Sequence, residues 1–410
     1  MKDHLLLRRA RVKGHEDLVD LRVEQGRIAE IAPTNGGAEA RPAEVIDVEG
    51  RLVVPGFVDA HLHLDKGLVS DRVLNRSGTL AEALQVMRKT KEGFTFEDIR
   101  DRARRQIEMA VSNGSTALRS HFDLDSAVGL LGAEALRALR DELKDLVTLQ
   151  LVALPHEDPT ASPEFLKLLK GAIELSDLIG GAPRPGDEKF VDLLFDLARE
   201  YDRDLDLHVD EKDEPEPLAI RYVARKTMKE GYEGRVTAGH LCALSSLEPG
   251  VSRDVVSQIR DAGLNVITLP STNLHIQGRG DDRSPRRGVT RVKEMLDEGI
   301  PVAYASDNLR DGFTPFGNAD MLEVGLILAH AAHMGTSEGL RAILDMGTET
   351  AGRIFYRNDN YGVHVGNDAD LVVLDTESFE KAIVTQPDRV RVFKKGRLVA
   401  RSSTVKELLL

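Results

Sequence analysis

The sequence predicts an α/β protein, with a (β/α)8 TIM-type barrel and a small β-sandwich domain formed from both termini. Three observations support this prediction. Short apolar runs alternate with amphipathic stretches over roughly 300 central residues, close to the ~250 residues of a typical barrel. Both ends instead contain short strand-like segments separated by glycines. The first strand of the alternating region ends in His61–Asp65, where a doubly wound sheet would have a glycine-rich phosphate turn.

The two ends of the chain are predicted to assemble into one small β domain, made of residues 1–54 and 358–410. Glycines such as Gly26 and Gly50 separate the N-terminal segments, and Gly396 interrupts the last one. The expected strands are Leu5–Val12, Leu18–Val23, Arg27–Ile31, Leu371–Leu374 and the alternating run Val390–Val399.

Residues 55–357 are predicted to form the barrel. The expected strands are Val53–His63, Thr116–Phe122, Thr148–Leu154, Asp177–Gly180, Leu205–His208, Val236–His240, Val266–Leu269 and Val302–Ser306. Helices are expected between them, at Phe96–Val111, from Pro163 onwards, at Phe190–Tyr201 and at Val255–Ala262. Thr95 and Ser162 stand at N-cap positions, and Gly114 and Gly263 follow helix ends.

The overall composition favours a cytoplasmic globular protein. The net charge of −13 argues against a general nucleic-acid binder, which would be basic. A single cysteine, Cys242, excludes an internal disulfide and fits a reducing compartment. No signal-peptide core and no apolar stretch near the ~18 residues of a membrane span is present, so a membrane location is not expected.

Histidines gather at the predicted strand ends. Alternation along a strand places His61 and His63 on one face, and the carboxyl ends of barrel strands are where active sites lie. Strand five ends at His208, strand six at His240 and strand eight at Asp307. We therefore expect His61, His63, His208 and Asp307 to hold one divalent ion. Scattered structural histidines are the alternative, but they would not explain this placement.

The same set of residues suggests a hydrolytic reaction. A divalent ion lowers the pKa of a bound water to about 7. Asp307 could bind the ion and take the proton of that water, and Glu211 could pass a proton to a ring nitrogen or a leaving amine. His240 could donate a hydrogen bond to the attacking oxygen. A second ion would need a bridging lysine after strand four, but residues 178–183 contain none, so one ion is expected.

These residues resemble the amidohydrolase superfamily. The similarity includes Val54–His63, which resembles the superfamily's first-strand signature, and Asn367–Leu374, which resembles a strand of its small domain. Within the superfamily, Asn273–Arg279, Arg286–Leu296 and His208–Glu211 are similar to cytosine deaminases. The resemblance implies a metal at His61, His63, His208 and Asp307, with Glu211 and His240 catalytic.

Other positions depart from cytosine deaminases and concern the substrate. His156 stands where those enzymes have a glutamine that contacts the pyrimidine, Asn308 replaces a second aspartate, and Phe313 aligns with a tryptophan. Ala305–Asp311 and Pro315–Asn318 instead resemble N-isopropylammelide aminohydrolases, which lack a glutamate at the position of Glu211. We expect His156, Asn308 and Phe313 to contact the substrate, with Gln277 as a further candidate on the loop after strand seven.

The predicted function is hydrolytic deamination of a small nitrogen heterocycle, such as a cytosine-like aminopyrimidine or an aminotriazine. Two alternatives stay open: release of an N-alkylamine or opening of a cyclic amide, and an inactive barrel that serves as a binding module. The ligand set suits zinc, iron or manganese, with zinc or iron favoured. The expected partner is a small heterocyclic substrate, and the resemblance implies a homo-oligomer.

Overall fold

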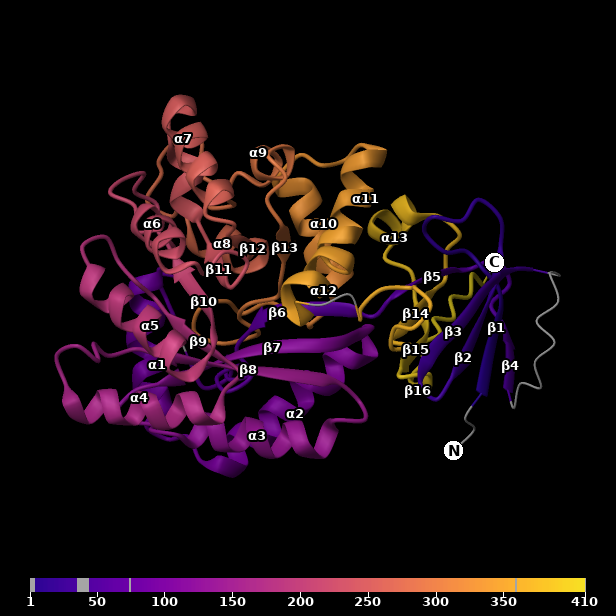
Figure 1. Cartoon of the computed structure of the whole chain (residues 1–410), viewed down its shortest axis with the longest axis horizontal. Helices are drawn as coiled ribbons and strands as arrows, with labels where there is room; N and C mark the ends of the chain where they lie inside the picture. Colours follow the sequence, from indigo (N-terminus) through magenta and orange to yellow (C-terminus); the bar gives the residue numbers. More distant parts are fainter. Residues whose placement is uncertain (1–3, 35–43, 74, 358–359, 410) are drawn as a thin grey trace.

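The computed structural model describes residues 4–34, 44–73, 75–357 and 360–409. It contains one eight-stranded sheet and two four-stranded sheets. The eight-stranded sheet and its helices lie on one side of Figure 1, and the two smaller sheets lie together on the other, near both ends of the chain. The predicted TIM-type barrel with terminal β sheets is therefore confirmed.

The strands of the barrel follow one another around the sheet in chain order, and each pairs in parallel with the next. They are β6 (Phe57–Leu62), β7 (Ser115–Leu124), β8 (Thr148–Pro155), β9 (Leu178–Gly181), β10 (Asp204–Val209), β11 (Val236–His240), β12 (Asn265–Thr268) and β13 (Val302–Tyr304). A parallel bridge between Leu62 and Asp307 joins the last strand region to the first. The backbone N–H of Asp307 donates to the carbonyl of His61 at 2.9 Å, so the closure itself brings two predicted ligands together.

The predicted strand Val53–His63 is two strands in the structure. β5 (Leu52–Pro55) pairs antiparallel with β14 (Leu371–Leu374) in a terminal sheet, and β6 begins two residues later in the barrel. Gly56 separates them. A Cβ on Gly56 would lie 2.2 Å from the side chain of Thr116, so only glycine lets the chain cross this closely from one sheet to the other.

Helices cover the outside of the barrel. The predicted helices are confirmed with their caps: α2 (Phe96–Ser112) starts after Thr95, and α4 (Pro163–Leu175) starts after Ser162, each cap oxygen accepting a backbone N–H. The others are α1 (Leu80–Lys91), α3 (Leu131–Leu143), α5 (Glu188–Tyr201), α6 (Ile220–Glu230), α7 (Pro249–Asp261), α8 (Pro270–Ile276), α9 (Val292–Asp297), α10 (Met321–Ala331), α11 (Ser337–Met346), α12 (Glu349–Tyr356), and the 3-10 turn η1 (Cys242–Ser246).

The terminal sheets share one apolar core. One sheet has the order β3-β2-β1-β4, from β1 (His4–Ala10), β2 (Val19–Glu24), β3 (Arg27–Pro33) and β4 (Glu44–Asp47). The other has the order β16-β15-β14-β5, where β15 is Arg389–Lys394 and β16 is Arg397–Ala400, and α13 (Phe379–Thr385) connects β14 to β15. Leu7 and Leu21 of the first sheet and Val373 and Phe393 of the second belong to the same buried cluster. The predicted boundary at residue 358 lies outside the described residues.

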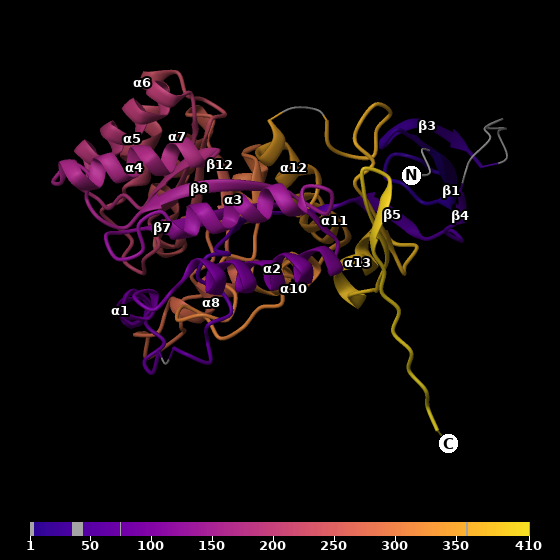
Figure 2. The ribbon, with the colours of Figure 1, turned by 90° about the horizontal axis from the view of Figure 1, so that it is seen from below.

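A buried ion pair fastens the C-terminal sheet to the barrel. Lys394 donates to Asp370, to the carbonyl of Thr116 and to the hydroxyl of Thr148, and Thr116 and Thr148 lie in barrel strands. Beyond β16 the chain runs away from the body (Figure 2). Among the described helices, none is both long enough and apolar enough to cross a membrane.

Candidate active site

Residues at the ends of three barrel strands are held in left-handed backbone conformations. His240 at the end of β11 has φ +70°, Asp307 after β13 has φ +61° and Asp210 after β10 has φ +51°. Residues other than glycine rarely adopt these angles, and such strain concentrates at functional sites. The turns direct the chain out of the sheet at its carboxyl edge, where the predicted catalytic residues follow.

Four predicted ligands converge at this edge. Nε2 of His63 lies 3.4 Å from Nε2 of His208 and 3.3 Å from Oδ1 of Asp307. Nε2 of His61 lies 3.8 Å from the same carboxylate oxygen. His61, His63 and Asp307 are all almost fully buried. The structure thus brings the ring nitrogens of all three histidines and the carboxylate within a few ångströms of one point.

The residues present fit a divalent metal ion. Both oxygens of Asp307, both ring nitrogens of His61 and Nδ1 of His63 are buried and accept or donate no hydrogen bond among the described residues. Leaving so many buried polar atoms unpaired would be costly unless a cation binds them. Burial lowers the pKa of His63 and of His208 well below the usual histidine value, which leaves their lone pairs free for ligation.

Glu211 and His240 lie beside this cluster. Oε1 of Glu211 is 3.5 Å from Nδ1 of His240. Burial, reinforced by the negative charge of Asp307, raises the pKa of Glu211 to about 8. Nδ1 of His240 also faces the side-chain amide of Asn273 at 3.1 Å, while its buried Nε2 has no hydrogen-bond partner in the part of the chain that the structure describes. The sequence did not single out Asn273, whose role depends on the path of α8.

Below the cluster lies a buried carboxylate that the sequence analysis missed. Asp206 on β10 has one oxygen 2.8 Å from Arg119 Nη1, while the other lies 3.8 Å from Nδ1 of His61 and 3.5 Å from Nε2 of His121. Burial opposes its charge, but His121, His61 and Arg119 hold the pKa of Asp206 below its usual value. Asp206 points inward two residues before His208, and that spacing on one strand was the available signal.

The predicted substrate-contacting residues lie on the loops above the cluster. Nε2 of His156 is 2.8 Å from Asp123, at the end of β7. The Asn308 amide donates to Asp311 at 2.6 Å, and the other oxygen of Asp311 accepts from the backbone N–H of Phe313 at 2.8 Å.

Gln277 is the fourth predicted substrate contact. It is 7% exposed, and its buried amide nitrogen has no hydrogen-bond partner among the residues described. The next residue, Gly278, donates its backbone N–H to Asp213 at 3.0 Å, which fixes the Gln277 loop to the loop after β10.

Two charged residues near the site are buried. Asp210 is 5% exposed and accepts the first N–H groups of α6, from Ala219 and Ile220. Lys66 is 2% exposed and donates to Asp123.

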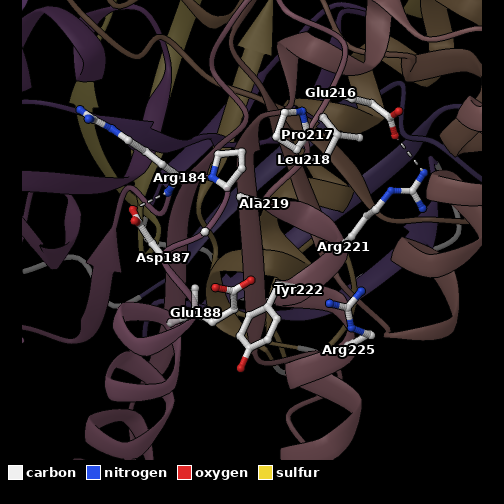
Figure 3. A pocket seen from close by; sticks show the side chains of 13 residues that line it. Arg184, Asp187, Glu188, Glu216, Pro217, Leu218, Ala219, Arg221, Tyr222 and Arg225 are labelled. Atoms are coloured by element: carbon white, nitrogen blue, oxygen red, sulfur yellow. Dashed lines mark hydrogen bonds and ion pairs between the residues drawn. The ribbon is translucent and has the colours of Figure 1, made fainter.

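A separate cavity of about 550 Å³ opens elsewhere, between the start of α5 and the start of α6 (Figure 3). Arg184, Glu188, Arg221 and Arg225 are among its lining residues. None of the predicted ligands or catalytic residues lines it. Glu216 pairs with Arg221 there at 3.5 Å.

Comparison with known proteins shows that this chain is similar to one family of enzymes. A model of the amidohydrolase family matches residues 44–148 and 166–400. The chain is 31% identical to N-isopropylammelide isopropyl amidohydrolase of Pseudomonas sp. strain ADP, over 98% of both chains. It is 32% identical to pterin deaminase of Rhizobium rhizogenes, over 93% of this chain and 88% of that protein.

Solved structures show the same similarity. The crystal structure of 5-methylcytosine deaminase from Klebsiella pneumoniae, liganded with 5-fluorocytosine, superposes with a TM-score of 0.93, 33% identity, and coverage of 98% of this chain and 99% of that one. N-isopropylammelide isopropylaminohydrolase from Burkholderia multivorans superposes with a TM-score of 0.84 and 27% identity, covering 97% and 98%. The predicted resemblance to both groups is confirmed, and the chain belongs to the amidohydrolase family.

Proposed function

We propose that this enzyme is a metal-dependent hydrolytic deaminase that removes an exocyclic amino group from a small nitrogen heterocycle, an aminopyrimidine or aminotriazine. The observation that carries this proposal is the placement of Glu211. Its carboxyl group lies beside His240 and close enough to Asp307 for the charge of Asp307 to raise its pKa. A partly buried acid at that place can move protons between the attacking oxygen, the ring and the leaving amine.

Each residue has a distinct task in this proposal. His61, His63, His208 and Asp307 would hold one divalent ion, which supplies Lewis acidity and a water of lowered pKa. Asp307 accepts a proton from the attacking water. Glu211, with a pKa raised to about 8, carries a proton at neutral pH and donates it to a ring nitrogen. His240 donates from Nε2 to the attacking oxygen. Glu211 then takes the proton of the new hydroxyl group and the proton on Asp307 passes to the amino group, so the C–N bond breaks to release ammonia and leave a ring carbonyl.

A second candidate is release of an N-alkylamine on the same scaffold. The identity of 31% with N-isopropylammelide isopropyl amidohydrolase across nearly the whole chain favours it, as do His156 and Asn308 in place of the residues of cytosine deaminases. The inactive binding module has no comparable support, since every proposed ligand and proton-transfer residue is present.

The experiment is product analysis with metal-loaded protein. The substrates are cytosine, 5-methylcytosine, isocytosine, creatinine, aminotriazines, pterin and N-isopropylammelide. Release of ammonia from one ring supports the deaminase. Release of isopropylamine without ammonia replaces it by the second candidate. No release of either product by protein that holds its metal overturns both.

Three further properties belong to the proposal. The ion is expected to be zinc or iron, with manganese as the alternative, and elemental analysis of freshly purified protein decides. The enzyme is expected to be a cytoplasmic homo-oligomer, which light scattering and cell fractionation test. Residues 1–54 with 358–410 form the small domain, and 55–357 the catalytic one, which limited proteolysis tests.

A further inference from the structure

Lys66 is a buried ammonium group that the reaction described above does not use. It lies on the loop that follows β6, three residues after His63, and its side chain is 3% exposed. Nζ donates to Oδ1 of Asp123 at 2.9 Å and lies 5.0 Å from the centre of the Phe313 ring. Charged lysines are almost never buried without a reason, so its surroundings need an explanation.

The loop that carries Lys66 is held firmly from below by α2. Arg102 donates to the carbonyls of Asp65, at 3.0 Å, and Gly67, at 2.7 Å, and Gln106 donates to the carbonyl of Leu64 at 3.0 Å. A Cβ on Gly67 would lie 2.1 Å from the Gln106 amide oxygen, so a side chain there would displace the amide that donates to Leu64. Such support is what a residue needs if it is to meet a ligand at a fixed position.

Lys66 has unused N–H donors, in contrast to Lys91, a second lysine that contacts Asp123. Lys91 on α1 donates to Asp123 at 3.0 Å and to Asp125 at 2.6 Å. Lys66 donates to Asp123 alone among the described residues. An ammonium group has three N–H donors, so two of those on Lys66 are unused in a nearly water-free position. Buried donors of this kind call for an acceptor.

The ammonium group lies among the residues that are predicted to contact the substrate. Nζ of Lys66 and Nε2 of His156 both contact Oδ1 of Asp123, at 2.9 Å and 2.8 Å, and Nζ is 5.0 Å from the centre of the Phe313 ring. Because Lys66 follows the end of β6, this group lies at the carboxyl edge of the barrel, where a substrate ring would bind.

The surroundings of Lys66 indicate which chemical group of a ligand would accept its hydrogen bonds. Asp65, Asp123 and Asp311 are carboxyl groups in the same region, so a ligand with a further carboxylate would meet negative charge. An amino group on the ligand would direct its own N–H donors at the N–H donors of Lys66. A neutral carbonyl oxygen on the ring meets both conditions.

We propose that Lys66, held by Asp123, is a specificity-determining residue that donates to a ring carbonyl oxygen of the substrate, so that the substrates are amino-oxo heterocycles rather than simple amino heterocycles. This inference rests on the proposed deaminase function and deepens it. The ammonium group of Lys66, already held in place by the fold, would select substrates that carry the carbonyl. His156 contacts the same oxygen of Asp123 at 2.8 Å.

The test compares two rings that differ in the carbonyl and the N–H beside it, cytosine and 4-aminopyrimidine, or the corresponding pair for the best substrate of the panel. Lys66→Met removes the donors and keeps the length of the side chain. We expect kcat/KM for the oxo ring to fall about 10- to 100-fold, and kcat/KM for the ring without the carbonyl to change less than about threefold. Metal content should not change.

Lys91→Met is the matched control, because it removes a buried lysine from the same carboxylate, and the ammonium group of Lys91 already donates to two carboxylates. Its preference for the oxo ring should equal that of the wild type. If Lys66→Met does not yield folded protein, Lys66→Leu replaces it. An unchanged preference in the folded Lys66 variant, or an equal loss in Lys91→Met, overturns the inference for Lys66. Failure of the wild type to deaminate any ring overturns the proposed function instead.

Discussion

The side-chain amide of Asn273, on α8, donates a hydrogen bond to Nδ1 of His240 at 3.1 Å. An amide nitrogen can only donate, so this contact assigns the proton of the His240 ring to Nε2. Nε2 is the nitrogen that is buried without a protein partner near His61 and His208. Asn273 thus sets which nitrogen of His240 can donate to the attacking oxygen.

Replacing Asn273 by leucine should release this constraint. Leucine has a similar volume and cannot donate, so the His240 ring is free to carry its proton on Nδ1, next to Glu211. We expect kcat to fall about 10- to 100-fold with KM nearly unchanged, by analogy with other residues that orient a histidine. Steady-state kinetics measure this, and equal changes in KM would show that Asn273 binds substrate instead.

Glu211→Gln should retain the metal and lose turnover. Glutamine fills the same space but cannot carry a proton between the oxygen, the ring and the amine. We expect kcat to fall by roughly 10² to 10⁴. Glu214→Gln, which changes an exposed acid on the same loop, is the control and should behave as wild type. Near-normal turnover in Glu211→Gln would remove Glu211 from the mechanism.

Removing the metal should destabilise the fold. The ligand atoms of His61, His63 and Asp307 are buried and would lose the cation that pairs them. An ion present at a hundredfold excess over its Kd stabilises the native state by about 2.7 kcal/mol, so chelation should lower Tm by several degrees. His208→Ala should lose the ion, and His275→Ala should keep it. A chelator that removes the ion without changing Tm would contradict the assignment.

His156→Gln should shift the substrate preference toward cytosine. A glutamine can donate to Asp123 and present its carbonyl oxygen, whereas Nε2 of His156 is already engaged with Asp123. The ratio of kcat/KM for cytosine to that for the best wild-type substrate measures the shift. An unchanged ratio would show that His156 does not contact the ring.

Asp311 should make folding stability depend on pH. Burial raises the pKa of its carboxyl group from 3.8 to about 6, against the opposing effects of Lys66 and Asn308. The folded state therefore binds the proton more tightly than the unfolded state. Stability from this group is present below about pH 4 and falls as the pH rises through 6, by at most about 3 kcal/mol.

Asp311→Asn isolates this effect. As the pH rises from 4 to 7, the free energy of unfolding of the wild type should fall relative to that of Asp311→Asn. Denaturant titrations at several pH values measure it. A difference that stays constant over this range would place the Asp311 titration elsewhere.

Much of the barrel could be predicted from short stretches of the sequence. Alternating apolar runs and caps such as Thr95 and Ser162 depend on neighbouring residues, so they are visible in the chain. The split at Gly56 was not visible, because β5 and β6 are both buried and mostly apolar, and only the pairing of β5 with β14 separates them.

The sequence by itself determined the types of side chain at the strand ends, since a histidine or an aspartate at the carboxyl end of a barrel strand must face the same rim as its neighbours. It thereby indicated His61, His63, His208 and Asp307 before any distance was known. Only the tertiary structure decided which partners hold these groups. Asp206, Asn273 and the Asp123 carboxylate shared by Lys66 and His156 act through contacts between strands and helices far apart in the chain, and no local pattern encodes such contacts.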